Sequence, residues 1–270
     1  MPLEQQVSWY PGHMAKAARR MRELLQLIDV VVEVVDARIV RSGRNPLLDE
    51  LAARRARVVA LTRDDLAEPK VTKRWLAELA GCGYAAVAVD ARSARSVARV
   101  AALVTQASPL GARTGGILRA MVVGIPNSGK SSIINAILKR SAARTEDRAG
   151  VTRHMQWFRL ARNAELVDTP GVLPPKISGA GAQWKLALCG AVPQDRYDPQ
   201  EVAAAFHRWL RARGAADRAP DLEAFAAQRG FLRRHGETDY HNAALSYVRA
   251  FNDGAFGRIS LEDPGDAEAA

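Results

Sequence analysis

The feature that most constrains the fold is a phosphate-loop motif in the middle of the chain. The segment GIPNSGKSS occupies residues 124–132, between the apolar run LRAMVVG and the helical pattern SSIINAILKR. Within it, Gly124, Gly129, Lys130 and Ser131 satisfy G-x-x-x-x-G-K-[ST] in the strand-to-helix context that the motif requires. Such a loop commonly follows the first strand of its domain, but here more than a hundred residues precede it.

The residues on both sides of the loop alternate between strand and helix patterns. Beside the strand that feeds the loop, short β-branched or apolar runs predict strands at residues 29–36, 57–61, 85–90, 155–160 and 164–170. Helical patterns fall between the early strands, at residues 47–55 and 71–80. Strands that alternate with helices predict an α/β fold with a mostly parallel sheet and helices on both faces.

From about residue 193 the pattern changes to helices alone. Three helical segments, each opened by an acidic residue suited to a helix N-terminus, lie at residues 198–214, 221–234 and 239–254. Their expected core comprises Trp209, Phe225, Phe231, Tyr247 and Phe251. We therefore expect an α/β domain at residues 1–190, opened by a basic helix at 13–28, and a small all-α domain at 191–270. The last residues, LEDPGDAEAA, are expected to form a frayed acidic tail.

Basic residues are concentrated in the first 190 residues. This part holds 29 Lys and Arg against 16 Asp and Glu, whereas the remainder holds 10 against 13. A localised positive charge attracts polyanions, of which nucleic acid is the usual one, and predicts salt-sensitive binding through phosphate contacts. Because Arg far outnumbers Lys and Ala is abundant, genomic composition stays open as a second interpretation.

The sequence argues against a membrane, secreted or metal-cluster protein. The best candidate for a membrane span, LIDVVVEVVDA, is broken by Asp29, Glu33 and Asp36, and the N-terminus lacks the apolar core of a signal sequence. Cys82 and Cys189 have neither metal-ligand spacing nor the density of a disulfide scaffold. We expect a cytoplasmic protein, and nothing in the sequence demands more than a monomer.

The phosphate loop has a recognisable chemistry. Its backbone N–H groups can close around the α- and β-phosphates, Lys130 can reach the β- and γ-phosphates, and the Ser131 hydroxyl can ligate magnesium. Downstream, ELVDTPG places Asp168 at a strand end, where its carboxylate can hold magnesium through water, and the Gly171 N–H can meet a γ-phosphate. Thr152, in the polar loop between them, can supply the remaining magnesium ligand.

The base-reading part of a GTPase lies before the phosphate loop. A GTPase normally carries N-K-x-D and then a short S-A-K loop after later strands, but the residues after 172 offer no such strand. Upstream, TRDD at residues 62–65 and DAR at residues 90–92 each follow a predicted strand. The sequence therefore predicts a circularly permuted P-loop GTPase domain.

With these motifs the chain resembles the ribosome biogenesis GTPase A family of circularly permuted GTPases. The resemblance extends in order over nearly the whole chain, through WYPGHMAKA, DVVVEVVDARIVRSGRNPLL, GIPNSGKSSIIN, GVTRHMQW, DTPGVLPPK and DYHNAALSYVRAFNDGAFGRISLEDP. It implies a factor for late assembly of the large ribosomal subunit that binds ribosomal RNA and hydrolyses GTP when engaged. This agrees with the localised basic charge, to which we expect Arg38, Arg41 and Arg44 to contribute.

The resemblance also implies roles for three residues around the phosphates. Asn127 is expected to help coordinate a potassium ion. Val172 stands where Ras-like proteins have a water-orienting Gln, so intrinsic hydrolysis is expected to be slow. The family's proposed substitute is the histidine of the P-G-H-M motif, here His13, which can orient or polarise the attacking water. A role for His13 as a helix cap or RNA contact stays open.

The chain departs from the family at the base-reading residues. Thr62 replaces Asn, Arg63 replaces Lys, and Asp90 and Arg92 replace Ser and Lys, whereas Asp65 is kept. Because Asp65 can accept from N1–H and the exocyclic amine of guanine, we expect weakened affinity rather than lost specificity. The residues expected to contact GTP are Thr62, Arg63, Asp64, Asp65, Asp90, Ala91, Arg92, Asn127, Ser128, Gly129, Lys130, Ser131, Ser132, Thr152 and Gly171.

Two alternatives to an assembly GTPase remain at this point. The first is an RNA-binding assembly factor whose G domain is degenerate and hydrolyses GTP weakly or not at all, suggested by Thr62, Asp90 and Val172. The second is a phosphate-loop ATPase or small-molecule kinase, against which Asp65 and the permuted order argue.

Overall fold

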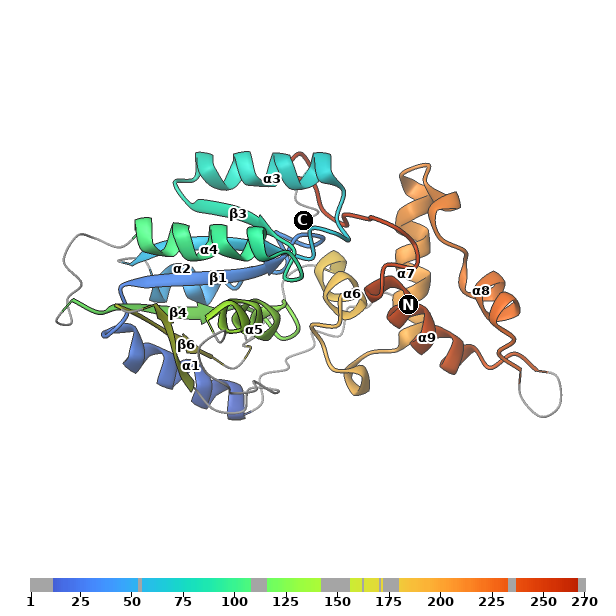
Figure 1. Ribbon diagram of the computed structural model, residues 1–270. Helices are drawn as coiled ribbons and strands as arrows, with labels where there is room; N and C mark the ends of the chain where they lie inside the picture. The colour runs from blue at the N-terminus through green and yellow to red at the C-terminus, as the bar shows by residue number, and fades with distance from the viewer. Residues whose placement is uncertain are drawn as a thin grey trace.

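A computed structural model of the chain describes residues 12–52, 55–107, 116–141, 156–161, 163–169, 171, 180–232 and 237–266. It contains an α/β part built on one sheet and a group of helices beside that sheet (Figure 1). The two kinds of structure follow one another along the chain in the predicted order.

Six strands form one sheet, in the spatial order β3-β2-β1-β4-β6-β5. They are β1 (Val30–Asp36), β2 (Ala56–Thr62), β3 (Ala85–Val89), β4 (Leu118–Val123), β5 (Gln156–Ala161) and β6 (Ala164–Asp168). The central strand β1 pairs in parallel with β2 and β4, and the β2·β3 and β4·β6 pairs are also parallel. The edge strand β5 runs antiparallel to β6. These pairings confirm the mostly parallel sheet.

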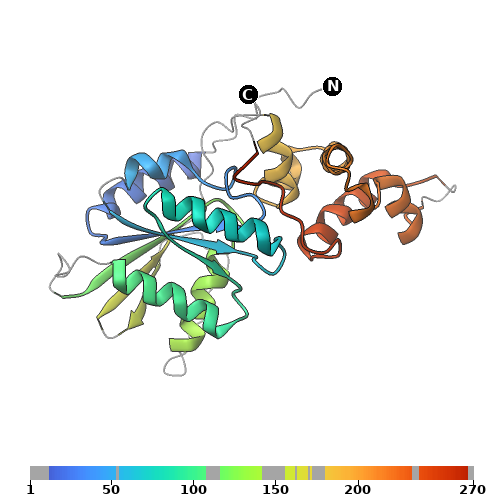
Figure 2. The same cartoon turned by 90° about the horizontal axis from the view of Figure 1, so that it is seen from above.

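Helices cover both faces of this sheet (Figure 2). One face carries α1 (Gly12–Leu25), α2 (Pro46–Leu51) and α3 (Pro69–Gly81), and the other carries α4 (Ala94–Ala107) and α5 (Lys130–Ser141). Alternate β1 side chains reach opposite faces: Val31 packs with α1 and α2, whereas Val32 packs in the cluster of α4 and α5. Because both faces are covered, all seven residues of β1 are buried.

The helices beside the sheet share one apolar cluster. They are α6 (Ala180–Leu188), α7 (Pro199–Ala212), α8 (Leu222–Arg229) and α9 (Tyr240–Asn252), with the 3-10 helices η1 (Gln194–Arg196) and η2 (Ala216–Arg218). The predicted acidic starts are confirmed as N-caps: the carboxylates of Asp198, Asp221 and Asp239 each accept from a backbone N–H of the first turn. Among the described helices, none has the length and apolar character of a membrane span.

The predicted aromatic core of this cluster is present, and it includes α6. Phe225, Tyr247 and Phe251 are buried, and Trp209 and Phe231 pack against them while partly exposed. Trp184 of α6 lies in the same cluster. Packing thus places α6 with the later helices, and the division of the chain at residue 190 stays a prediction.

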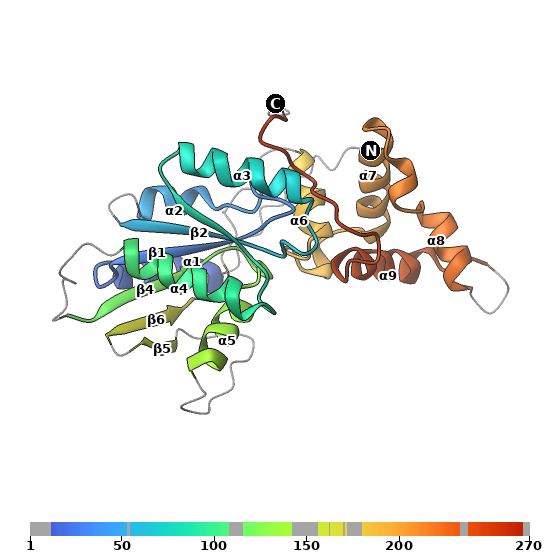
Figure 3. The same ribbon diagram turned by 45° about the horizontal axis from the view of Figure 1, so that its top comes forward.

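The chain after α9 returns along the α/β part toward α3 (Figure 3). The prediction of a frayed tail is wrong for residues 261–266, while residues 267–270 lie outside the described chain. Leu261 is fully buried, and the buried Glu262 carboxylate accepts from the backbone N–H groups of Arg41 (2.7 Å) and Ser42 (3.0 Å). The Ser42 hydroxyl also donates to Glu262, and Lys185 pairs with it at 3.3 Å. Glu262 therefore docks the C-terminal segment onto the loop after β1 and onto α6.

Substitution of Glu262 by alanine tests this docked arrangement. We expect the free energy of unfolding to fall by roughly 2–4 kcal/mol, because two backbone N–H groups and the Lys185 ammonium lose their acceptor. Urea denaturation followed by circular dichroism measures the change, with Glu78→Ala on the exposed side of α3 as the control. A loss below about 0.5 kcal/mol, typical of a solvated surface position, would contradict the docking.

Candidate nucleotide-binding site

The motif residues around the phosphate loop that the structure describes lie at the carboxyl edge of the parallel strands. The phosphate loop connects β4 to α5 there. Pairing in register places Asp36, at the end of β1, beside Thr62, at the end of β2, and it places Asp168 beside Val122 of β4. The loops after β1, β2 and β6 therefore surround the phosphate loop, which is the usual position of a ligand site in an open α/β sheet.

The phosphate loop needs glycine at two positions. Gly124 has a φ of +154°, and a Cβ there would lie 2.4 Å from the Val34 carbonyl oxygen. Gly129 has a φ of +94°, and a Cβ there would lie 3.2 Å from the Thr62 side chain. Both positions therefore combine a backbone conformation that side chains avoid with close neighbours. The motif glycines let the loop pack against the ends of β1 and β2.

Lys130 is buried within this loop. Its ammonium donates to the carbonyl oxygens of Ile125 (2.7 Å) and Gly124 (3.2 Å). Burial lowers the pKa of Lys130 to about 8, although the nearby Asp168 charge acts in the opposite direction. The ammonium thus lies at the loop, where it donates only to neutral carbonyl oxygens. Charged phosphate oxygens are stronger acceptors and can replace them.

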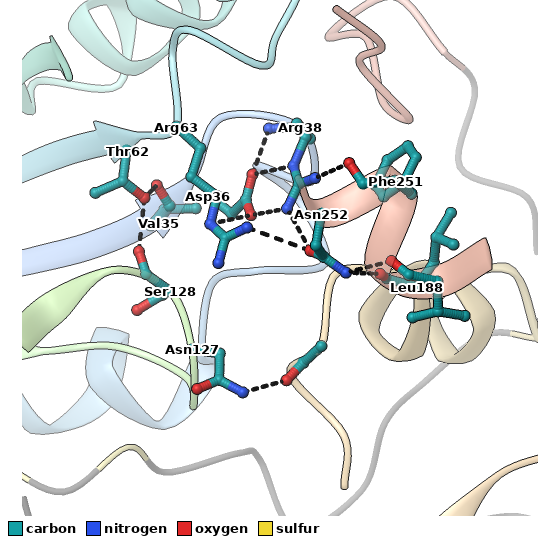
Figure 4. Close-up of polar contacts among 12 residues, drawn as sticks. Val35, Asp36, Arg38, Thr62, Arg63, Asn127, Ser128, Leu188, Phe251 and Asn252 are labelled. Carbon is teal, nitrogen blue, oxygen red and sulfur yellow. Dashed lines mark hydrogen bonds and ion pairs between the residues drawn. The ribbon is translucent and has the colours of Figure 1, made fainter. Parts of the chain in front are cut away.

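Thr62, which replaces the family's asparagine, contacts the phosphate loop. Its buried hydroxyl lies 2.6 Å from the Ser128 carbonyl oxygen and 3.1 Å from that of Val35 (Figure 4). Since a hydroxyl has one proton, it donates to one of the two at a time, and the shorter contact ties β2 to the phosphate loop. Because Thr62 lies close to Gly129, its short side chain can reach the Ser128 carbonyl oxygen.

The two base-reading segments also lie together. Asp65, in the loop after β2, forms an ion pair with Arg92, in the loop after β3. Arg92 pairs in turn with Asp90 at 3.2 Å, and its side chain is 75% exposed. Exposed ion pairs of this kind contribute little free energy because water screens them. Asp65 is therefore available to a stronger set of donors.

Arg63 adopts a left-handed backbone conformation, with a φ of +54°. Its half-buried side chain lies 3.6 Å from the Asp36 carboxylate and donates to Asn252 of α9 at 3.2 Å. The base-reading loop is thereby connected to the helical part of the chain.

Two predicted magnesium ligands and Gly171 lie around the phosphate loop. Ser131 is in the first turn of α5, and the buried Asp168 ends β6 beside β4. A hydroxyl and a carboxylate are the hard oxygen donors that magnesium prefers, so these residues fit the ion. A Cβ on Gly171 would lie 2.7 Å from Pro126 and 3.0 Å from the Lys130 ammonium, which places the Gly171 backbone against the loop.

Three predicted residues cannot be placed by their side chains. His13 lies in the first turn of α1, but the described chain gives only its backbone. Thr152 and Val172 lie outside the described residues. Their roles stay predictions.

The structure corrects the expectation for the arginines after β1. Arg38 is 1% exposed and forms a two-fold hydrogen bond with Asp36, through Nη2 at 2.8 Å and Nε at 3.0 Å. Arg41 contacts the C-terminal segment, and Arg44 pairs with the buried Glu33 at 3.1 Å. Arg38 is therefore not available to RNA, and it has a structural task at the nucleotide edge.

Sequence reasoning missed Asn252 and the Asn127 contact altogether. The Asn127 amide, in the phosphate loop, donates to the Gly190 carbonyl oxygen at 2.6 Å. Asn252 accepts from Arg38 and Arg63. These contacts join chain segments that lie far apart in sequence, so no local sequence pattern predicts them.

Comparisons with known proteins decide the family. A family model described as "50S ribosome-binding GTPase" matches residues 119–204. Ribosome biogenesis GTPase A of Priestia megaterium is 36% identical over 286 residues, covering 97% of this chain and 98% of the relative. This chain belongs to the ribosome biogenesis GTPase A family. A relative of the same name from Thermotoga maritima is 32% identical over 262 residues and covers 96% of this chain and 95% of its own length.

Solved structures agree with this family. The crystal structure of GNP-bound YlqF from T. maritima has a TM-score of 0.73 and 29% sequence identity, covering 93% of this chain and 100% of that chain. The predicted circularly permuted GTPase fold is thus confirmed. The chain is a GTPase of ribosome biogenesis, and the ATPase or kinase alternative is wrong. Hydrolysis by such GTPases depends in general on a magnesium ion.

The buried Lys130 predicts how nucleotide affinity depends on pH. Phosphate oxygens favour the charged ammonium, so bound nucleotide raises the pKa of Lys130 above its value of about 8 in the free protein. Below pH 7 the lysine is charged in both states and affinity is constant with respect to this group. Above pH 8 binding must take up a proton, so the affinity for GDP falls by up to about ten-fold per pH unit.

Calorimetric titration of GDP between pH 6.5 and 9.0 measures this dependence. Lys130→Arg is the control, because a guanidinium stays charged over the whole range and its profile should be flat. A wild-type affinity that does not change between pH 7 and 9 would contradict the assignment.

Proposed function

We propose that this GTPase acts on the large ribosomal subunit, binds its ribosomal RNA in a nucleotide-dependent way, and works as a monomer in the cytoplasm. The large subunit is supported by the matching family model, which is described by binding to the 50S particle. RNA binding is supported by the charge of residues 1–190 and by the exposed Arg19, Arg20 and Arg22 of α1. The bound nucleotide then determines how firmly the protein holds the subunit.

The observation that carries the guanine-nucleotide site is the contact of Thr62 with the phosphate loop, 2.6 Å from the Ser128 carbonyl. It joins the base-reading loop to the phosphate-binding loop. In the proposed site Asp65 accepts from N1–H and the amine of guanine, and Lys130 binds the β- and γ-phosphates. The Arg63 stem lies along the base. The other proposed contacts are Asp64, Asp90, Ala91, Arg92, Asn127, Ser128, Gly129, Ser132 and Gly171.

Magnesium would be held by Ser131 and Thr152 directly and by Asp168 through water. Held there, a magnesium ion would supply positive charge to the β- and γ-phosphate oxygens. We also assign a potassium ion to Asn127. Because its Nδ2 donates to Gly190, its amide oxygen is the atom left to meet a cation.

For hydrolysis, His13 is the proposed residue that orients or polarises the attacking water. Val172 offers a hydrocarbon side chain, which can neither donate nor accept a hydrogen bond. The proposal places the start of α1 near the nucleotide when the subunit is engaged, which would make hydrolysis slow alone and faster on the subunit.

Phosphate release tests this function. The rate is measured with GTP or ATP, in potassium or sodium buffer with magnesium, and with or without large ribosomal subunits. We expect subunits to stimulate phosphate release from GTP but not from ATP, and we expect the rate with GTP to be lower in sodium than in potassium. His13→Ala should abolish the stimulation and keep GDP affinity, whereas His241→Ala, on the exposed face of α9, should change neither. Equal rates with and without subunits would contradict the proposal.

Asp65→Asn tests the base-reading assignment directly. An asparagine keeps one acceptor for N1–H but turns an amide donor toward the guanine amine, so GTP affinity should fall by roughly 2–3 kcal/mol, about 30- to 150-fold. Xanthosine triphosphate offers a carbonyl oxygen at that position and should bind the variant better than GTP. Competition of both nucleotides against labelled GDP measures the selectivity, with Asp217→Asn, at an exposed position of η2 outside the proposed site, as the control. Unchanged preference for GTP would refute the role of Asp65.

A further inference from the structure

The base-reading loop and the residues that follow it contact the C-terminal part of the chain at Arg63, Leu66 and Glu68. At its start Arg63 donates to Asn252. Further on, the Leu66 carbonyl accepts from the Ile259 N–H at 3.0 Å, and the Glu68 N–H donates to the Ser260 hydroxyl at 3.0 Å. These contacts lie on the side of the loop that faces α9 and the returning chain.

The approach at this side is close. Gly254 follows α9 with a φ of +80°, and a Cβ there would lie 2.7 Å from the Leu66 side chain. The phosphate loop has its own contact with the same region, from Asn127 to Gly190. Both nucleotide-binding loops therefore rest on the segment that begins with α6 and ends with the returning chain.

Asn252 has a fixed orientation in this contact (Figure 4). Its amide nitrogen lies 2.7 Å from the Leu188 carbonyl oxygen and 2.9 Å from that of Val248. Carbonyl oxygens accept and cannot donate, so the nitrogen must face them and the oxygen must face the arginines. The oxygen lies 3.1 Å from Nη2 of Arg38 and 3.2 Å from Nη1 of Arg63.

The charges explain why a further acceptor is needed here. Two guanidinium groups meet one carboxylate, and Arg38 already takes both oxygens of Asp36. Arg63 is left with a contact of 3.6 Å to Asp36, longer than a hydrogen bond. Asn252 supplies the missing acceptor, from a helix that is itself anchored to α6 through Leu188. Removal of this oxygen leaves Arg63 without that anchor.

We propose that Asn252 is a positioning residue for the guanine nucleotide: it holds Arg63, and with it the base-reading loop, so that the C-terminal helices set how tightly nucleotide is bound. This inference rests on the proposed role of residues 62–65 in reading the base. Coupling between binding sites is reciprocal, so nucleotide also strengthens the docking of α9, and a partner that draws α9 away weakens nucleotide binding.

The test measures the affinity and dissociation rate of fluorescently labelled GDP on the full-length protein. Asn252→Ala should raise the Kd about three- to ten-fold, mainly through faster dissociation, while kcat at saturating GTP stays within two-fold. Asn242→Ala, at the exposed first turn of the same helix, should leave the Kd within two-fold. An Asn252→Ala variant with wild-type Kd would overturn the proposal.

A double-mutant cycle identifies the route of the effect. If Asn252 acts through Arg63, adding Asn252→Ala to Arg63→Ala should change the Kd by less than two-fold. An effect of the same size in both backgrounds would show that Asn252 does not act through Arg63 and would overturn the proposal.

Asn252→Asp separates positioning from folding. The carboxylate keeps acceptors for Arg38 and Arg63 but loses the donor to the Leu188 and Val248 carbonyls, so the melting temperature should fall while the Kd stays within two-fold. Loss of affinity equal to that of Asn252→Ala would overturn the proposal. Failure of the base-site assignment looks different, because Asp65→Asn would then keep wild-type selectivity.

Discussion

The ion pair between Asp36 and Arg38 is the interaction on which the candidate nucleotide-binding site, at the carboxyl edge of the sheet, depends. Burial alone would raise the pKa of Asp36, but the charge and hydrogen bonds of Arg38 hold it below its usual value. Burial would likewise lower the pKa of Arg38, and Asp36 raises it above the usual value. Both groups therefore stay charged. Removal of either would leave the other as an unpaired buried charge and lower the free energy of unfolding by roughly 3–5 kcal/mol. The Arg38 guanidinium also lies 4.8 Å from the Phe251 ring centroid, so the pair fixes the end of α9.

This pair makes the nucleotide edge a joint product of the sheet and the helices. In the permuted order β6 is the last strand of the sheet and lies beside β4, which leads into the phosphate loop, and the next described element along the chain is α6. Those helices return to contact Asn127 on one side of the site and Arg63 on the other. In this chain α9 and the returning C-terminal segment therefore support the base-reading loop. We place the control of nucleotide binding at this contact.

Much of the fold could be predicted because its signals are local. The phosphate loop, the buried strands and the capped helices are each written in consecutive residues. Helix α4 is not among the predicted helices, although Val97, Val100 and Val104 follow helical spacing. Contacts such as Arg63 to Asn252 join residues separated by 189 positions, and no local pattern shows them. The docking of Glu262 has the same character, because the N–H groups of Arg41 and Ser42 that it accepts from lie far away in sequence, and the local pattern is that of a solvated acidic tail. At position 62 a threonine replaces the family's asparagine, and because Gly129 has no side chain the Thr62 hydroxyl can still reach the Ser128 carbonyl oxygen.

Hydrogen exchange tests the central claim that nucleotide and the C-terminal helices act on one loop. The amide of Glu68 donates to Ser260, and the amides of Ile259 and Leu261 donate to Leu66 and Arg38. These amides report the docking itself. We expect GDP to slow exchange both in residues 63–68 and at the docked amides of Ile259 and Leu261. Protection confined to the phosphate loop and residues 63–68, with unchanged exchange at Ile259 and Leu261, would contradict it.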